Sequence, residues 1–300
     1  MTPHASRDAQ SEAIGRQNML FSEEQLERYS RHFVLQEIGV SGQKRLLHSK
    51  VLVIGAGALG SSALMYLAAA GIGTIGIADY DRVELSNLHR QTIHRIQTIG
   101  REKTISAAEA IAQINPDVDV ELYHEKMTVN NIQNILQHYD FIIDGVDRFE
   151  SKFLINDACV LSQRPYSHAG AVRFEGQVMT YIPGQGPCLR CLLEKVPPRE
   201  NTLTCSQAGV LGAVTGILGS LQALEAIKYL LGIGELLVGK VLRFDGLTMH
   251  NRISNIPHAN PSCGVCGSHP AILCLSDNKA EYGESECALP QEPQITRGNV

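Results

Sequence analysis

The sequence predicts an α/β fold in which a doubly wound, mostly parallel sheet is followed by an antiparallel C-terminal part. Short apolar strands alternate with helix-length segments as far as residue 161, and strand-like pieces with cysteine-bearing loops prevail beyond Pro165. The chain has 300 residues, 44% hydrophobic and 19% charged, enough for one sizeable core. We expect a disordered N-terminal tail (1–20), a single domain (21–275) and a loose C-terminal tail (276–300).

The predicted elements begin at Ser22, which forms a capping box with Gln25 at the start of a helix. Residues 51–78 then read as a strand, a helix and a second strand, separated by glycine-rich turns. The later elements are predicted from apolar periodicity and from Pro and Asn breakers: helices over 104–114, 130–138 and 150–161, and strands over 118–122, 141–144, 177–182, 241–244 and 250–256.

Two apolar stretches, 51–78 and 206–224, are long enough to suggest a membrane span, but their glycines argue for turns and for a buried, closely packed helix. The N-terminus lacks the apolar core of a secretory signal, so we expect a cytoplasmic protein with its eight cysteines reduced or metal-bound. A formal net charge of -5 gives no general attraction to nucleic acid or to an anionic membrane, and we expect neither as a partner.

The hexapeptide GAGALG, residues 55–60, lies between a predicted strand and a predicted helix. Gly55, Gly57 and Gly60 permit a tight turn and a close approach of phosphate, and the helix N-terminus supplies N–H donors. Asp79 closes the next strand, where its carboxylate can hold a ribose hydroxyl. This context predicts a Rossmann-like nucleotide-binding half. The alternative is a glycine turn that only packs the helix on the strand.

The residues after Asp79 favour one kind of nucleotide over another. A redox dinucleotide keeps its pyrophosphate intact, whereas a nucleotide whose phosphates are transferred needs cations beside the leaving group. The motif SNLHRQ supplies Asn87, Arg90 and Gln91, and Lys103 lies further along the chain. Each cation taken singly is more commonly a solvated surface charge. Together they favour phosphate chemistry over NAD-dependent redox chemistry.

The motif FIIDGVD places Asp144 and Asp147 at the carboxyl edge of the parallel sheet, where ligands bind. A carboxylate at this edge can hold magnesium beside nucleotide phosphates. The alternative is that one of the two carboxylates caps the helix that begins near residue 149. Both interpretations stay open for Asp144.

Two CxxC pairs, Cys188 with Cys191 and Cys263 with Cys266, supply four soft thiolates, the ligand set of a tetrahedral structural zinc. Such a zinc would tie a distant loop to the C-terminal segment and would leave no open position for catalysis. A redox CxxC is the main alternative. Cys205 lies in a polar loop before the glycine-rich helix, whose N-terminus would favour its thiolate, although a purely structural cysteine fits equally well.

A series of motifs occurs in a characteristic order: RYSRHFVLQEIG, GAGALG, DYD followed by LSNLHRQ, INPDV, DGVD, CLRC, TCSQAGVLGAVTGILGSLQALEAIK and CGVCG. In this set the chain resembles the MoeB/ThiF adenylyltransferases, relatives of the ubiquitin-activating enzymes, over roughly residues 20–270. The resemblance implies a homodimer that uses ATP and magnesium to convert the C-terminal glycine of a ubiquitin-like sulfur carrier, ThiS-like or MoaD-like and ending in Gly-Gly, into an acyl-adenylate.

The resemblance also implies a later sulfur-transfer step and a set of participating residues. A sulfur donor converts the adenylate into a thiocarboxylate for thiamin or molybdopterin biosynthesis, and we expect a separate donor because no rhodanese domain is evident. The implied roles, all placed by motif, are phosphate binding by Gly55, Gly57 and Gly60, ribose binding by Asp79, phosphate handling by Asn87, Arg90, Gln91 and Lys103, magnesium binding by Asp147, and an ATP contact by Arg31 from the other subunit.

Three positions qualify the resemblance. Arg148 stands where the family commonly has asparagine, which changes a local hydrogen bond, and His89 replaces a usual glutamine. Cys205 matches a cysteine that in some relatives forms a covalent link with the carrier or relays sulfur. Because an ionised carboxylate can attack the α-phosphorus without a base, we expect the histidines, His168 included, to be structural or solvated.

Other functional classes compete with this interpretation. An NAD-dependent oxidoreductase would use the same glycine turn, and a non-catalytic, zinc-stabilised scaffold would bind the carrier without activating it. A dehydratase acting on modified tRNA adenosine shares the implied fold. The net charge of -5 and the lack of a basic stripe disfavour that last class.

Overall fold

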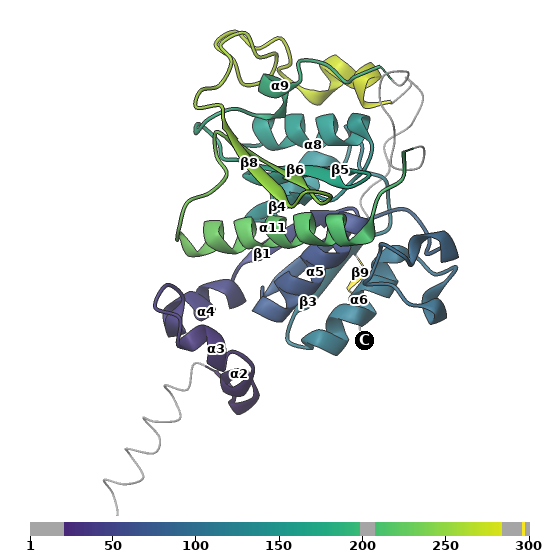
Figure 1. Ribbon diagram of the computed structural model, residues 1–300, viewed down its shortest axis with the longest axis vertical. Helices are drawn as coiled ribbons and strands as arrows, with labels where there is room; N and C mark the ends of the chain where they lie inside the picture. The colour runs from purple at the N-terminus through teal and green to yellow at the C-terminus, as the bar shows by residue number, and fades with distance from the viewer. Residues whose placement is uncertain (1–20, 199–207, 284–295, 298–300) are drawn as a thin grey trace, which may run out of the picture. The chain divides into compact units, whose positions relative to one another are not determined.

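The computed structural model describes residues 21–198, 208–283 and 296–297 (Figure 1). They fall into two compact units, one ending at Arg45 and the other beginning at Leu46. The first unit holds α2 (Glu23–Arg28), α3 (Ser30–Phe33) and most of α4 (Gly39–Leu47). The predicted capping box is confirmed, because Ser22 and Gln25 each accept a hydrogen bond from the other's backbone N–H at 3.1 Å.

The described part of the second unit is built on a nine-stranded sheet of order β8-β7-β6-β5-β4-β1-β2-β3-β9. β1 pairs in parallel with β2 and β4, β2 with β3, and β4 with β5, whereas β5 to β8 and the β3–β9 pair are antiparallel. The predicted fold class is therefore confirmed. The strands are β1 (Lys50–Ile54), β2 (Thr74–Ala78), β3 (Asp119–Tyr123), β4 (Phe141–Asp144), β5 (Tyr166–Val172), β6 (Glu175–Tyr181), β7 (Lys240–Asp245), β8 (His250–Asn255) and β9 (Thr296–Arg297).

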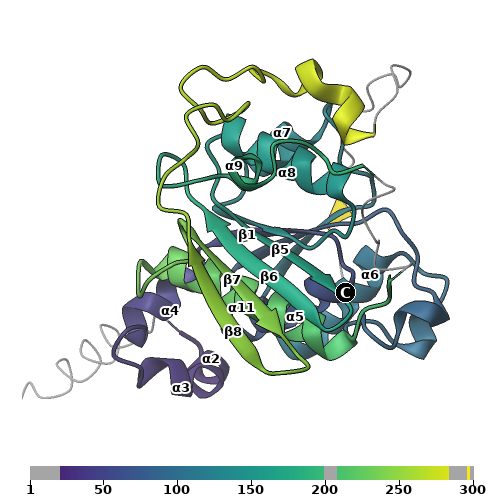
Figure 2. The same ribbon diagram turned by 45° about the horizontal axis from the view of Figure 1, so that its top comes forward.

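Helices cover both faces of this sheet (Figure 1, Figure 2). α5 (Ala58–Ala70), α6 (Lys103–Ile114) and α11 (Gly212–Leu231) lie on one face, and α7 (Ile132–Leu136) and α8 (Phe149–Leu161) lie on the other. The shorter helices are α9 (Leu189–Leu192) and the 3-10 helices η1 (Leu85–Asn87), η2 (Ile96–Thr98) and η4 (Leu275–Tyr282). None of the described helices combines the length and apolarity that a bilayer crossing needs.

The two apolar stretches fold as the glycine pattern predicts. The first becomes β1, α5 and β2, and the second enters α11, which packs along α5. A Cβ on Gly219 of α11 would lie 2.1 Å from the carbonyl oxygen of Leu59, so only glycine allows the two helix backbones to approach this closely. The small residues of these helices therefore serve close packing inside a folded domain.

Two segments differ from the sequence-based expectation. Residues 166–172 form β5, which the sequence did not predict because YSHAGAV lacks the β-branched alternation typical of a strand. The C-terminal segment was expected to be loose from residue 276, but Leu275 and Tyr282 of η4 are buried. Tyr282 donates a hydrogen bond from its hydroxyl to Asp157 of α8 at 2.6 Å, which holds this segment against the domain.

The strand order reverses at β1, because β2 and β3 extend to one side of it and β4 and β5 to the other. Open parallel sheets bind ligands at such a switch point, beyond the carboxyl ends of the strands. Here the residues that follow β1 and β4 are Gly55 and Gly145, and the N–H of Gly145 donates to the carbonyl oxygen of Ile54 at 2.8 Å. The candidate site is built around these two turns.

Candidate functional site

The glycine turn places its three glycines in different surroundings. Gly55 has φ +98°, and a Cβ there would lie 2.8 Å from the carbonyl oxygen of Gly145. A Cβ on Gly60 would lie 1.9 Å from the carbonyl oxygen of Gly55. At Gly57 the nearest atom would be Nε2 of Gln91, at 3.9 Å. Gly55 and Gly60 therefore close the turn, and Gly57 leaves open space at the N-terminus of α5.

This open space has the polar groups that a phosphate needs. Gly57 is the N-cap residue of α5 and no side chain caps the helix, so its first N–H groups are available to an anion. Gln91 is only 5% exposed, and its Oε1 is one of two buried side-chain atoms in the described residues that lack a hydrogen-bond partner. A buried amide without a partner is costly unless a ligand or water satisfies it. A water or a nucleotide hydroxyl can donate to Oε1, and Nε2, which faces the space at Gly57, can donate to a phosphate.

Asp79 lies at the carboxyl end of β2, beside the glycine turn. Its Oδ2 accepts a hydrogen bond from the N–H of Ala56 and its Oδ1 accepts one from the N–H of Asp81, both at 2.8 Å. Burial raises the pKa of Asp79 above its usual value, and the charge of Lys103 opposes this shift. The carboxylate is fixed at the turn, where a ribose hydroxyl of a bound nucleotide can reach it.

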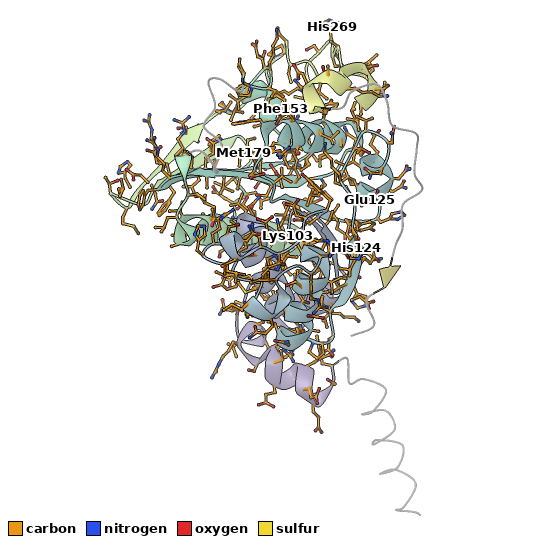
Figure 3. The ribbon with its side chains drawn as sticks, turned by 90° about the vertical axis from the view of Figure 1, so that its right-hand side faces the viewer. Lys103, His124, Glu125, Phe153, Met179 and His269 are labelled. Carbon is orange, nitrogen blue, oxygen red and sulfur yellow. The ribbon has the colours of Figure 1, made fainter. Side chains whose placement is uncertain are left out.

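Lys103 is the first residue of α6 and is 6% exposed, so it is not a solvated surface charge. Its Nζ donates to Oδ2 of Asp81 at 2.8 Å. The start of α6 is also held by a hydrogen bond between Nδ1 of His124 and Thr104. Figure 3 labels Lys103 and His124 on this side of the domain. The ammonium is therefore positioned close to Asp79, at the same edge of the sheet.

Asn87 and Arg90 make hydrogen bonds within their own loop. Oδ1 of Asn87 accepts from the N–H of Glu84 at 3.2 Å. Nη1 of Arg90 donates to the carbonyl oxygen of Ser86 at 2.9 Å. The structure thus brings Gln91, Asp79 and Lys103 to the glycine turn, and it gives Asn87 a role in the fold of the loop.

His94 joins the glycine turn to α6, a connection that no local pattern in the chain indicates. The ring is 3% exposed, and Nε2 lies 2.9 Å from the carbonyl oxygen of Ala56 while Nδ1 lies 2.9 Å from Oγ of Ser106. Because a carbonyl oxygen only accepts, Nε2 carries a proton. Burial lowers the pKa of His94 to about 4, so the ring is neutral at physiological pH.

The lowered pKa of His94 predicts a pH-dependent stability. Between about pH 6.5 and 4 the unfolded chain binds a proton that the folded ring does not. The free energy of unfolding therefore decreases as the pH is lowered through this range. In urea titrations, the stability advantage of the wild type over His94→Gln should shrink by about 2 kcal/mol from pH 7 to about pH 5. The control His89→Gln changes an exposed histidine of the same loop and should show no such narrowing. If the difference in free energy of unfolding between the wild type and His94→Gln stayed constant from pH 7 to about pH 5, the assignment of a buried, neutral His94 would be contradicted.

Asp144 and Asp147 have opposite surroundings. Asp147 is exposed in the turn after β4, as a magnesium-binding carboxylate requires. Asp144 is fully buried, and its carboxylate lies 3.1 Å from Nζ of Lys152 and 2.8 Å from Nδ1 of His168. The capping alternative is wrong for both, because the N-cap residue of α8 is Arg148. Magnesium binding by Asp144 is also excluded, since its carboxylate faces the interior.

The four cysteines of the CxxC pairs converge as predicted. Their sulfur atoms all lie within 4.8 Å of one another. The Cys188–Cys263 distance is 3.6 Å, and Cys191 and Cys188 each lie 3.4 Å from Cys266. A tetrahedron of sulfurs about 2.3 Å from zinc has edges of about 3.8 Å, so the cluster fits this metal with little adjustment.

Arg190, inside the CLRC motif, anchors the loop of Cys188 and Cys191 to the core. Its guanidinium donates to Asp157 of α8 at 2.8–2.9 Å, pairs with Glu281 at 2.8 Å and lies over the ring of Phe153. Sequence reasoning missed this network, because a lone arginine between two cysteines gives no sign of its partners. These ion pairs attach the loop of Cys188 and Cys191 to both α8 and η4.

For two predicted site residues the structure gives no contact with these groups. Arg31 is an exposed residue of α3 in the first unit. Cys205 lies outside the described residues. The structure leaves the predicted roles of both untested.

Comparisons with known proteins place this site in a wider group. The sequence model of the ThiF family matches residues 29–265. The adenylyltransferase and sulfurtransferase MOCS3 of Anopheles gambiae is 43% identical over 85% of this chain, and that of Bos taurus is 43% identical over 88%. This chain spans 58% of the length of each of these relatives. A crystal structure of E. coli MccB with ATP superposes with a TM-score of 0.69 at 25% identity, over 80% of this chain and 74% of that one.

Proposed function

Since the chain belongs to the ThiF family, we propose that it is an ATP-dependent adenylyltransferase that activates the C-terminal glycine of a small ubiquitin-like sulfur carrier. The observation that carries the proposal is the open space at Gly57, which borders the Nε2 donor of Gln91 and the N-terminus of α5. An anionic phosphate accepts hydrogen bonds from both groups. The adenylyltransferase names of the relatives and the ATP bound to MccB agree with this use of the turn.

In the proposed reaction, a carboxylate oxygen of the carrier attacks the α-phosphorus of ATP, and the bond to the bridging oxygen breaks. Pyrophosphate leaves with the electron pair of that bond. No general base is needed, because the carboxylate is ionised at neutral pH, so alignment and neutralisation of the leaving group dominate. Lys103, held by Asp81, and Arg90 are the cations that we assign to pyrophosphate, and Asp79 to the ribose.

Asp147 is the residue that we assign to magnesium. Its carboxylate is exposed, and carboxylate oxygens are ligands that Mg²⁺ prefers beside phosphates. The turn that carries it also contacts the glycine turn, through Gly145 and Gly55. When bound, the ion neutralises phosphate charge. The four-cysteine cluster is assigned a structural zinc, and the thiolates that it needs are typical of a reducing, cytoplasmic location.

A homodimer is part of the proposal. The outer faces of α5 and α11 form a groove of about 590 Å³ whose lining includes Met65, Tyr66, Ile217 and Leu224. Tyr66 is 57% exposed and Leu224 is 49% exposed. An exposed apolar surface of this kind supports an interface with a second copy. We assign to that second copy the Arg31 that contacts ATP.

The proposed carrier ends in Gly-Gly and belongs to thiamin or molybdopterin biosynthesis, with sulfur from a separate donor. The expected result is ATP–pyrophosphate exchange that appears only when a cognate carrier is added. Candidate carriers from the same organism, each tested for an added AMP by intact mass, identify the partner. The matched control is the same carrier without its last two glycines. Tight NADH binding without ATP binding would favour an oxidoreductase, and carrier binding without adenylate would favour a scaffold.

Cys205 is assigned to sulfur transfer and not to adenylation. Its thiol has no place in the attack of a carboxylate on phosphorus. We therefore propose that carrier adenylation does not depend on it, even where the later thiocarboxylate step does.

A further inference from the structure

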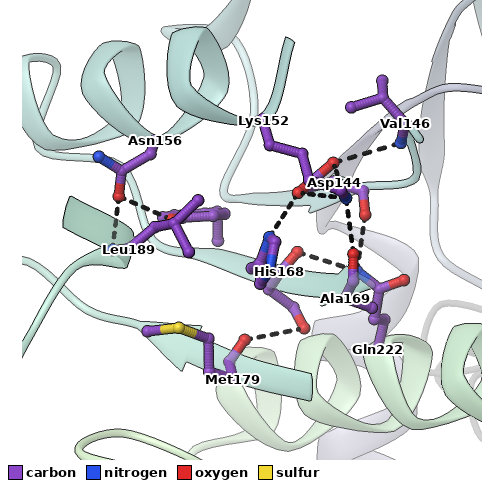
Figure 4. A network of polar contacts seen from close by, with 11 residues as sticks. Asp144, Val146, Lys152, Asn156, His168, Ala169, Met179, Leu189 and Gln222 are labelled. Carbon is purple, nitrogen blue, oxygen red and sulfur yellow. Dashed lines mark hydrogen bonds and ion pairs between the residues drawn. The ribbon is translucent and has the colours of Figure 1, made fainter. Parts of the chain in front are cut away.

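A buried charged cluster lies directly beneath the turn that carries Asp147. The carboxylate of Asp144 accepts hydrogen bonds from Nζ of Lys152 at 3.1 and 3.2 Å and from Nδ1 of His168 at 2.8 Å (Figure 4). Lys152 also donates to the carbonyl oxygen of Ala169 at 2.6 Å. The side chains of Lys152, Asp144 and His168 are at most 5% exposed. None of the three takes part in the reaction proposed above.

The charges of this cluster are balanced. Burial alone would raise the pKa of Asp144, but Lys152 and His168 hold the pKa below its usual range, so the carboxylate is ionised. Burial and the charge of Lys152 lower the pKa of His168, which leaves the ring neutral with its proton on Nδ1. One ammonium therefore faces one carboxylate, and the histidine supplies an additional hydrogen bond.

The cluster and its neighbours fix the backbone of the turn on several sides. Oδ1 of Asp144 accepts a hydrogen bond from the N–H of Val146 at 3.2 Å. The carbonyl oxygen of Asp144 accepts one from Gln222 of α11 at 2.9 Å. Gly145 lies against the glycine turn, since its N–H bonds the carbonyl oxygen of Ile54. The exposed Asp147 is the next residue after Val146, so its carboxylate extends from a backbone that these bonds hold in place.

We propose that Lys152, His168 and Asp144 are positioning residues, which hold the 145–147 turn so that the Asp147 carboxylate meets magnesium beside the phosphates. The inference rests on the proposed function for the identity of the metal and its nucleotide. Asp144 lies on β4, Lys152 on α8 and His168 on β5. Asp144 and His168 are paired directly across the two parallel strands. Residues that orient a metal ligand typically contribute 10–100-fold to metal affinity or activity.

The test uses the full chain and a readout that needs no carrier. Calorimetry gives the dissociation constant of ATP with and without Mg²⁺. The constant without Mg²⁺ divided by the constant with Mg²⁺ is a ratio that measures how much magnesium strengthens ATP binding. His168→Leu removes the hydrogen bond to Asp144, and we expect that ratio to fall by about tenfold while metal-free ATP binding stays unchanged. His168→Asn, which can still donate to the carboxylate, should restore most of the ratio.

The matched control is Tyr166→Phe in the same strand. It removes a buried hydrogen bond of 2.8 Å to Asn156, which does not contact the turn, so it should lower the melting temperature and leave the ratio unchanged. If His168→Leu does not fold, the double variant Asp144→Asn with Lys152→Met replaces it, because it leaves no unpaired buried charge. A ratio equal to that of the control overturns the inference.

The same measurements separate this inference from the proposed function. A wild type whose ATP binding does not respond to magnesium overturns the inference, because the turn then holds no metal. A wild type that binds ATP with magnesium but adenylates no carrier contradicts the proposed function alone. The His168→Leu ratio still decides the positioning role in that case.

Discussion

Lys103→Ala is expected to reduce ATP–pyrophosphate exchange by at least about a hundredfold, because it removes a preorganised cation from the leaving group. Lys103 is 6% exposed and its ammonium is held 2.8 Å from Asp81, so little reorganisation is needed when negative charge develops. Asp81 itself has a half-exposed side chain, and the loss of the ion pair should cost little stability. Exchange of radiolabelled pyrophosphate into ATP in the presence of the carrier measures the effect.

The matched control for this variant is Arg101→Ala, two residues away. Arg101 forms a surface ion pair with Glu109 at 2.6 Å and is 44% exposed, so its removal should leave exchange within about twofold.

Asp147→Asn should also abolish exchange if that carboxylate holds magnesium. Undiminished exchange in both Lys103→Ala and Asp147→Asn would show that the site has been assigned to the wrong residues.

Cys263→Ser is expected to remove the bound metal and to lower the free energy of unfolding by several kcal/mol. Structural zinc contributes about 10 kcal/mol or more to the folding of small peptides, and here it would join loops that are far apart in sequence. Cys263 is 3% exposed and lies 3.6 Å from Cys188, so a weaker ligand at this position breaks a closed site. Metal analysis and chemical denaturation measure the two effects.

The control for the zinc prediction is Cys274→Ser, which changes an exposed cysteine outside the cluster. It should keep one zinc per chain and the stability of the wild type. Wild-type protein without zinc, in which Cys188 and Cys191 or Cys263 and Cys266 form reversible disulfides, would instead support the redox alternative.

Several features of the site are encoded in short stretches of sequence. The glycine turn was predictable because a strand, a turn and a helix within one βαβ unit are adjacent in the chain, and their geometry depends on local spacing. The four-cysteine cluster was predictable for a related reason. Each CxxC pair is a local chelating unit, and four thiolates are a ligand set that suits tetrahedral zinc.

Other features depend on contacts that no local pattern contains. The strand β5 was missed because its sequence, YSHAGAV, is selected by burial between β4 and β6 and not by strand propensity. With β5 missing from the prediction, His168 had no reason to meet Asp144. Magnesium and helix capping were then the interpretations weighed for Asp144. The N-cap residue of α8 is instead Arg148, and the buried Asp144 carboxylate is paired with Lys152 and His168.

By itself, then, the sequence determined that this protein has a doubly wound α/β fold with a glycine turn and a set of four cysteines that can hold a metal. Only the tertiary structure decided which polar residues face the ligand and which support them. It exposes Asp147 while it buries Asp144, and it ties the turn to α6 through His94. The physical reason is that burial and charge pairing depend on elements distant in the chain, whereas turns and chelating pairs are encoded within a few residues.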